Sequence, residues 1–101
     1  MAYRYRITIE MLGVRAGSDQ DGTSLQFCID NHDDLLKIAE TIRSKRWFDK
    51  DKSASLAIGL KLFSEIVLEK TRDYVFAPLV LPLRNFINRF KSTPAANKAA
   101  N

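Results

Sequence analysis

The sequence predicts an α+β fold, an N-terminal two-stranded antiparallel hairpin followed by three helices. Apolar and polar residues alternate with a period of two over about 3–12 and again over about 24–30. After residue 31, apolar residues recur at helical spacing in three segments, about 32–46, 54–70 and 79–91. A chain of 101 residues is long enough for one domain with its own core. We therefore expect a single α+β domain over 1–91 and a flexible C-terminal tail over 92–101.

The hairpin is predicted to have one apolar and one polar face. The apolar side chains of the two strands are Tyr3, Tyr5, Ile7, Ile9, Met11, Leu25, Phe27 and Ile29. The loop of about 13–23 contains three glycines and an Asp-Gly pair, which indicate a turn. A lone two-stranded ribbon is only marginally stable in water. We therefore expect the helices, or a second copy of the chain, to cover the apolar face.

The segment after the second strand carries the signals of a helix start. Asn31 is a good N-cap, and Asp33 and Asp34 would place negative charge in the first turn, where the helix dipole favours it. The apolar residues that follow share one face: Leu35, Ile38, Ala39 and Ile42. This pattern predicts a first helix over about 32–46 that buries this face.

The second helical segment is the most apolar part of the chain, which predicts a central helix capped by Ser53. Its expected apolar face covers about half of the circumference at about 100° per residue. This face consists of Leu56, Gly59, Leu60, Leu62, Phe63, Ile66 and Val67. A glycine inside a helix costs about 1 kcal/mol relative to alanine. A close backbone approach at Gly59 would explain its presence, and Gly59→Ala would then destabilise the protein.

Two prolines mark the start of the third helix. Proline is tolerated in the first turn of a helix but not deep inside it. The helix should therefore begin between Pro78 and Pro82 and end near Lys91, after a turn or short helix at 71–76 for which Asp73 is a candidate cap. Its expected apolar face consists of Leu79, Leu83, Phe86, Ile87 and Phe90.

Composition favours a cytoplasmic protein with no membrane partner. The longest apolar run, Val75–Leu83, is interrupted by two prolines and is far shorter than the about 20 residues of a spanning helix. The first ten residues lack the apolar centre of a secretory signal. Cys28 is the only cysteine, so an intrachain disulfide cannot form, which is typical of a reducing compartment.

The net charge of +4 comes entirely from the C-terminal part. Residues 1–73 hold 12 Lys/Arg and 12 Asp/Glu, and the four cations after them meet no acid: Arg84, Arg89, Lys91 and Lys98. A basic end can attract phosphate groups, which supports a weak, phosphate-directed nucleic-acid binder as an alternative function. Four dispersed cations are also what a solvated helix face and tail would show.

The densest cluster of polar residues suggests a candidate site at His32, Asp33 and Asp34, with Cys28 nearby. It would make the chain a small-molecule enzyme or a ligand-binding protein, which is a further alternative. The chain holds one histidine and one cysteine, too few for a typical zinc site. A helix start explains the acidic residues without any ligand. We therefore expect no catalytic residue, no metal and no cofactor.

Two features predict an interaction surface. Large apolar residues in the expected connectors, with two cations of the last helix, form a candidate patch: Trp47, Phe48, Phe76, Arg84 and Arg89. Buried, the aromatic residues would instead cap the helix ends. The hairpin leaves two strand edges open, and a second hairpin could pair with one of them across a two-fold axis. This would give a homodimer with a four-stranded sheet.

Three separated motifs occur in order along the chain: YRITIE at Tyr5–Glu10, LQF at Leu25–Phe27 leading into NHDD at Asn31–Asp34, and LAIGLKLF at Leu56–Phe63. Together they resemble a family of short bacterial proteins that is a domain of unknown function. The resemblance covers nearly the whole chain up to about Lys91. It implies a stand-alone bacterial domain and brings no catalytic residue, cofactor or substrate. The sequence thus predicts a non-enzymatic protein-interaction module that self-associates and contacts a further protein partner.

Overall fold

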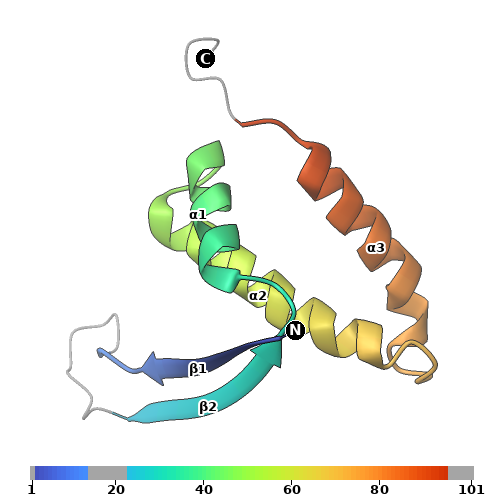
Figure 1. Ribbon diagram of the computed structural model, residues 1–101, viewed down its shortest axis with the longest axis horizontal. Coiled ribbons are helices and arrows are strands. Elements are labelled where there is room, and N and C mark those ends of the chain that lie inside the picture. Colours follow the sequence, from blue (N-terminus) through green and yellow to red (C-terminus); the bar gives the residue numbers. More distant parts are fainter. Residues whose placement is uncertain (1, 14–22, 96–101) are drawn as a thin grey trace. The chain divides into compact units, whose positions relative to one another are not determined.

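The computed structural model describes residues 2–13 and 23–95 and has the predicted α+β class. A two-stranded antiparallel hairpin is followed by three helices (Figure 1). The chain divides into two compact units, Met1–Asp33 with the hairpin and Asp34–Asn101 with the helices. The tip of the predicted hairpin loop, 14–22, lies outside the described residues.

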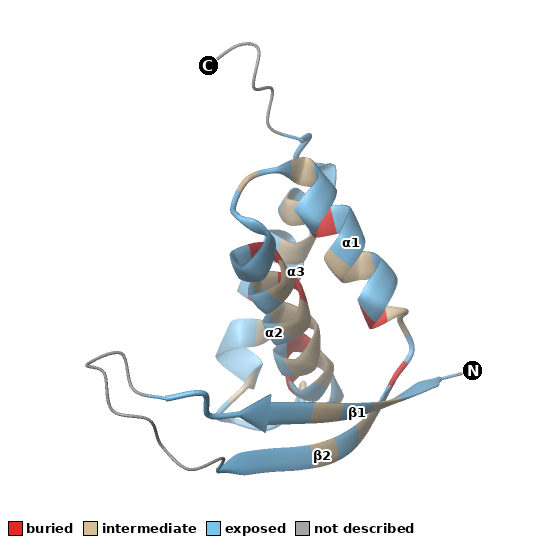
Figure 2. Cartoon of the chain, turned by 90° about the vertical axis from the view of Figure 1, so that its left-hand side faces the viewer, coloured by how far each residue is buried: buried red, intermediate tan, exposed pale blue. Residues whose placement is uncertain are grey.

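The hairpin consists of β1 (Tyr3–Glu10) and β2 (Ser24–Asn31), close to the predicted bounds. The strands pair in register from Tyr3 opposite Asn31 to Glu10 opposite Ser24. The pairs Tyr5–Ile29 and Ile7–Phe27 are half-buried, whereas most other strand residues are exposed (Figure 2). The period of two therefore places the apolar residues on one face, as predicted. That the helices cover this face stays a prediction.

The first helix, α1, spans Leu35–Lys45 and begins later than predicted. Asp34 is its N-cap, and its Oδ1 accepts a hydrogen bond from the Lys37 backbone N at 3.1 Å. The prediction of Asn31 as the N-cap was wrong, because Asn31 is the last residue of β2. Its Oδ1 accepts from the Asp33 backbone N at 2.9 Å, a local turn that ends the strand before the helix can start.

The predicted apolar face of α1 is confirmed. Leu35 and Ile42 are buried, and Ile38 and Ala39 between them are half-buried. The helix ends at Lys45. The C-cap residue Arg46 has a left-handed backbone with φ of 59°, and its N–H donates to the Arg43 carbonyl.

The second helix, α2, spans Lys50–Glu69 and contacts both α1 and α3, so its predicted central place is confirmed. Asp49 is its N-cap and accepts from the Lys52 backbone N at 2.8 Å. The predicted cap, Ser53, lies inside the helix instead, fully buried, with its hydroxyl donating to the Phe48 carbonyl at 3.4 Å. The first turn escaped the sequence prediction because its residues are charged and carry no apolar period.

The buried face of α2 differs from the predicted one. The residues that it buries are mostly small: Ser53, Ala57, Ser64 and Val67. They lie within one narrow stripe at about 100° per residue. Phe63 and Ile66, from the predicted apolar face, are 48% and 54% exposed. Small side chains let a neighbouring helix approach closely, and the serine hydroxyls bond to backbone carbonyls nearby, so α2 packs through its small residues.

Gly59 has no close neighbour, contrary to the prediction from the sequence. A Cβ built at Gly59 would meet nothing within 4 Å, and the residue is exposed. Gly59→Ala is therefore expected to raise the free energy of unfolding by about 0.5–1 kcal/mol, because alanine restricts the unfolded chain and favours the helix. Urea denaturation followed by circular dichroism measures the change. A lower stability would contradict the open surroundings of this residue.

The third helix, α3, spans Ala77–Ser92, with Pro78 in its first turn and Pro82 inside it. The predicted start between the two prolines was therefore late. The turn before the helix explains the earlier start, because the Asp73 carbonyl accepts from the backbone N–H groups of Phe76 and Ala77. The Asp73 carboxylate also accepts from the Val75 backbone N at 2.9 Å, which confirms the predicted turn. Of the expected apolar face, Leu83 is buried, whereas Phe86 is 47% exposed.

Candidate functional site

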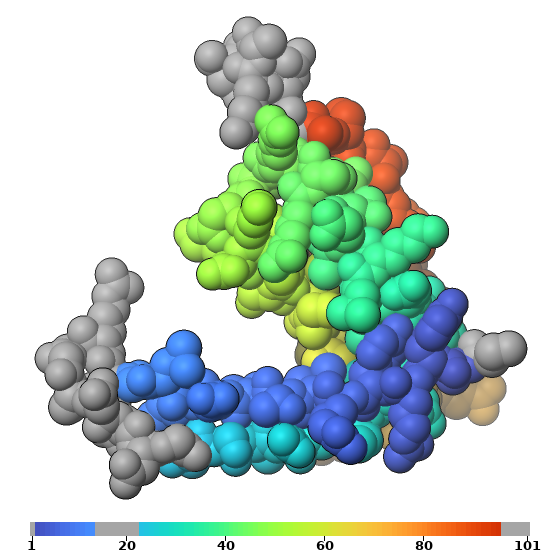
Figure 3. Space-filling model, turned by 60° about the vertical axis from the view of Figure 1, so that its left-hand side comes forward, coloured from blue at the N-terminus to red at the C-terminus, as the bar shows by residue number. Residues whose placement is uncertain are grey.

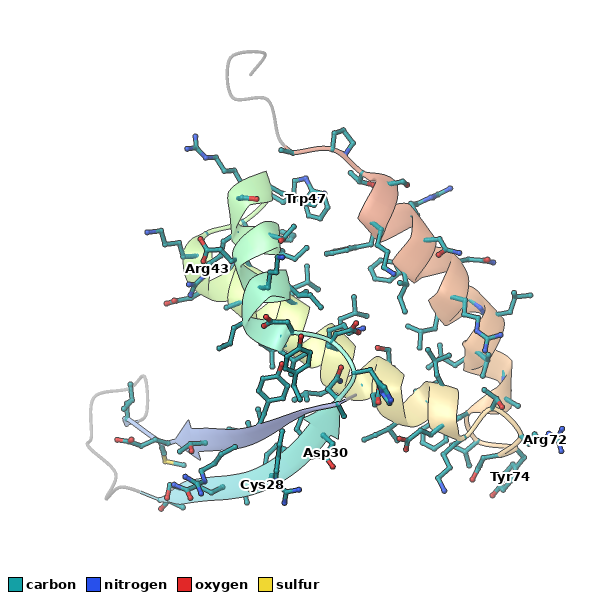
Figure 4. All side chains as sticks on the ribbon, viewed as in Figure 1. Cys28, Asp30, Arg43, Trp47, Arg72 and Tyr74 are labelled. Carbon is teal, nitrogen blue, oxygen red and sulfur yellow. The ribbon has the colours of Figure 1, made fainter. Side chains whose placement is uncertain are left out.

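The polar face of the hairpin carries charges of both signs on β1 and of one sign on β2. Arg4 and Asp30, opposite each other in the register, form an ion pair with Arg4 Nη1 at 3.4 Å from Asp30 Oδ1. Both side chains are well exposed, so the pair adds little to stability. Cys28 lies opposite Arg6 and is also exposed. Figure 4 labels Cys28 and Asp30 on β2.

Taken by itself, the hairpin has strand edges that pair with no further strand among the described residues, and it carries large apolar side chains. Among the described residues the sheet has two strands only, so each strand has one outer edge. In Figure 3 the side chains of β1 (blue) and β2 (cyan) form two adjacent rows. Tyr3, Ile9 and Leu25 are 50%, 58% and 57% exposed. Unpaired strand edges next to exposed apolar side chains are typical of a surface that pairs with another chain.

In the polar cluster predicted as a candidate site, Asp34 and the Asp33 backbone take part in local structure. The Tyr5 hydroxyl donates to the Asp33 carbonyl at 2.8 Å, Asp34 caps α1, and His32 is exposed. Asn31 is almost fully buried, and its Nδ2 has no hydrogen-bond partner in the described part of the chain. No group of three or more His, Cys, Asp or Glu side chains able to hold a metal occurs in residues 2–13 and 23–95. The cluster joins the end of β2 to the start of α1.

Trp47, from the predicted interaction patch, attaches the end of α3 to the connector between α1 and α2. Its ring packs edge-on against Phe90, with ring centroids 5.0 Å apart, and its Nε1 donates to the Pro94 carbonyl at 3.0 Å (Figure 4). Lys45 lies over the Trp47 ring and donates from Nζ to the Thr93 carbonyl at 2.8 Å. The first residues of the predicted flexible tail therefore bond to the helical unit, while 96–101 lie outside the described residues.

The aromatic members of the predicted patch do not form one cluster around Trp47. Phe48 is 50% exposed and lines a shallow, open hollow with Lys52, Ser55 and Leu56. Phe76 is half-buried at the N-cap of α3, roughly 21 Å along the helix axis from Phe90, the ring that contacts Trp47. The predicted patch is thus divided between the two ends of α3.

The cations of α3 do not form one stripe. Arg84, Arg89 and Lys91 are exposed. At about 100° per residue, Arg84 and Lys91 share one side of the helix and Arg89 lies well away from it. Lys98 lies outside the described residues. Among the described residues, no helix is both long enough and apolar enough to cross a bilayer.

Comparison with known proteins identifies the family. Residues 3–92 match DUF3861, described as a domain of unknown function with a solved structure. The chain belongs to the DUF3861 family. It is similar to the crystal structure of a protein of unknown function from Pectobacterium atrosepticum, with 27% sequence identity and a TM-score of 0.78. This similarity covers 92% of the present chain and 100% of the other. No curated protein matches the chain. The resemblance found in the sequence to a domain of unknown function is thereby confirmed.

Two features of this DUF3861 chain were missed by reasoning from sequence. One is the exposed position of Phe63 and Ile66, because α2 is apolar around much of its circumference and the pattern alone favours burying its largest side chains. The other is the ion pair between Arg4 and Asp30. The alternating pattern placed both residues on the polar face of the hairpin, but only the register shows that they lie opposite each other.

Proposed function

We propose that this protein is a non-enzymatic interaction module that forms a homodimer through an edge of its hairpin. The observation that carries the proposal is the two-stranded sheet, in which each eight-residue strand has one partner among the described residues. Such ribbons are marginally stable alone, and natural proteins cover or blunt exposed edges. A second hairpin would add strands on one edge and shield apolar side chains of the strand that it pairs with, such as Ile9 of β1.

The helical unit supports a role in protein–protein interaction beyond self-association. Phe63 and Ile66 on α2 and Phe86 on α3 are each about half exposed. Phe63 and Ile66 are three residues apart and so lie on one side of α2. Exposed large apolar side chains that lie together are typical of contact with a further protein. By contrast, the titratable residues of the predicted ligand site cap a helix, accept at the backbone or are exposed, which favours an interaction module over an enzyme.

The first experiment measures the mass of the unmodified protein in solution. Multi-angle light scattering at micromolar concentration is expected to give twice the chain mass of 11.5 kDa, with a shift towards the monomer on dilution. The monomer mass at every concentration up to the millimolar range would reject self-association. A mass that grows without limit would indicate open, head-to-tail pairing of β1 with β2 rather than a closed dimer.

We further propose a bacterial, cytoplasmic location. The family resemblance, together with the similarity to a Pectobacterium atrosepticum protein, supports the bacterial origin. The single cysteine, which is exposed on β2, fits a reducing compartment. Fractionation of the native cells, with immunodetection of the protein in each fraction, tests the location.

A further inference from the structure

The pairing pattern of the hairpin determines which backbone groups its edges present. The Met11 backbone N donates to the Thr23 carbonyl at 2.9 Å, and these residues continue the register of the strands. In an antiparallel pair, residues that bond to the partner strand alternate with residues that do not. The odd-numbered residues of β1 therefore bond to β2. The N–H and C=O groups on the outer edge of β1 belong to Arg4, Arg6, Thr8 and Glu10.

The apolar pattern restricts how two β1 edges can pair. In an antiparallel sheet, directly opposite side chains lie on the same face, so a shift of one residue would place apolar against polar residues. To keep all apolar side chains on one face, the two-fold axis must pass beside a residue, so that this residue lies opposite the same residue of the second copy. An axis that passed between two residues would place apolar residues opposite polar ones. The centres that engage most of the strand are Arg6, Ile7 and Thr8.

The charges of β1 distinguish these three registers. A centre at Arg6 places this arginine directly opposite Arg6 of the second copy, which is unfavourable. A centre at Ile7 places Arg4 opposite Glu10 of the second copy, twice by symmetry, and Arg6 opposite Thr8. A centre at Thr8 pairs Arg6 with Glu10 but engages only residues 6–10 of the strand, instead of 4–10. The Ile7 register thus combines opposite charges with the longer overlap.

The apolar face is complementary in the same register. Ile7 lies against Ile7 across the axis, and Tyr5 lies opposite Ile9 of the second copy on both sides. Pairs of an aromatic with a β-branched residue are among the favourable cross-strand contacts. Tyr3, which is 50% exposed, would lie opposite Met11, which is 44% exposed.

The outer edge of β2 lacks this complementarity. By the same alternation, its outward groups belong to Ser24, Gln26, Cys28 and Asp30. Asp30 is the one charged residue of β2, so no two-fold pairing of two β2 strands can oppose an anion to a cation. The edge of β1 therefore fits a second copy better than the edge of β2 does.

We infer that two copies of this chain pair antiparallel through β1, about a two-fold axis at Ile7, with Arg4 of each copy bound to Glu10 of the other. The inference rests on the proposed homodimer and specifies its interface. The resulting sheet has the order β2–β1–β1–β2. On its polar face Arg4 lies between Asp30 of its own hairpin, with which it already pairs, and Glu10 of the second copy.

Charge reversal tests this pairing. Arg4→Glu or Glu10→Arg alone places like charges opposite each other twice and is expected to raise the dimer Kd about tenfold. An equimolar mixture of the two single variants should form a heterodimer with near-normal Kd, because both cross-copy pairs are again opposite in charge. The Arg4→Glu, Glu10→Arg double variant should likewise recover. Analytical ultracentrifugation measures each Kd, and circular dichroism confirms that each variant is folded.

Two controls separate this register from the others. Asp30→Asn removes the ion pair within the hairpin and should leave the dimer Kd unchanged. Mixing Arg6→Glu with Glu10→Arg should not restore a near-normal dimer Kd, because these two residues are not opposite each other in the Ile7 register. If Glu10→Arg restored the dimer Kd of Arg6→Glu but not that of Arg4→Glu, the axis would lie at Thr8 and the inference would be overturned. A dimer Kd that none of these substitutions changes would overturn the inference but retain the proposed homodimer. A monomeric unmodified protein overturns both.

Cysteine cross-linking gives an independent readout. In a Cys28→Ser background, Ile7→Cys should oxidise to a disulfide-linked dimer, because Cα atoms at a non-hydrogen-bonded pair lie about 4.5 Å apart, within the range of disulfides. In the same background, Thr8→Cys is the matched control and should cross-link less. Rapid cross-linking of the unmodified protein through Cys28, with none through Ile7→Cys, would assign the interface to β2 and overturn the inference.

Discussion

Ile42→Ala is expected to lower the free energy of unfolding by about 2–5 kcal/mol, the usual loss for truncating a buried aliphatic side chain. Ile42 is 5% exposed, on the face of α1 that also buries Leu35, and α1 packs against α2. The buried side chains of α2 are mostly small, so they cannot extend into the cavity that the truncation of Ile42 would leave. Urea denaturation followed by circular dichroism measures the loss.

Leu36→Ala is the matched control for this prediction. Leu36 lies on the same helix, has a side chain of the same composition and is 74% exposed. Its truncation should change the stability by no more than about 0.5 kcal/mol. Equal losses for Ile42→Ala and Leu36→Ala would contradict the buried face of α1 and, with it, the packing of α1 on α2.

Trp47→Ala is expected to cost about 2–3 kcal/mol, less than the about 3–5 kcal/mol of a fully buried tryptophan, because Trp47 is only half-buried. The substitution removes the edge-on contact with Phe90, the hydrogen bond to the Pro94 carbonyl and the ring beneath Lys45. These contacts attach the C-terminal end of α3. Amide hydrogen exchange should therefore accelerate most in the last turns of α3.

Two further variants separate the contributions of Trp47. Trp47→Phe keeps a ring against Phe90 but loses the indole N–H, so about 0.5–1.5 kcal/mol should be lost. Phe48→Ala removes the neighbouring aromatic side chain, which is 50% exposed and has no such bond among the described residues, and should cost less than Trp47→Ala. Similar losses for Phe48→Ala and Trp47→Ala would show that the bonds of Trp47 do not hold α3 in place.

Local sequence signals predicted most of the secondary structure. The period of two gave the bounds of β1 and β2 to within a few residues, and the spacing of Leu35 and Ile42 identified the buried face of α1. Errors occurred where two signals compete. Asn31 and Asp34 are both suitable N-caps, and pairing of Asn31 with Tyr3 in the sheet decided for Asp34. At the start of α2, Asp49 and Ser53 are likewise both suitable N-caps, and the earlier one, Asp49, caps the helix.

The candidate sites were less predictable than the elements. The acids at the end of β2 suggested a ligand site, but the same residue types serve as turn and cap residues, and the structure places Asp34 in that role. Trp47 and Phe76 were grouped because both lie in connectors, yet they fall at opposite ends of α3. Distance along the sequence carries no information on which ends of helices meet.

By itself the sequence determined the number, type and order of the elements, since periodicity, capping residues and prolines act over a few neighbouring residues. It also determined the mixed charges of β1 and the single charge of β2. Only the tertiary structure decided which face of α2 is buried, because several faces of that helix are apolar enough. The close approach of a neighbouring helix selects the small residues Ser53, Ala57 and Ser64 and leaves Phe63 and Ile66 exposed. Which face of a helix is buried depends also on the surface that packs against it, and a single stretch of sequence describes only one of these two surfaces.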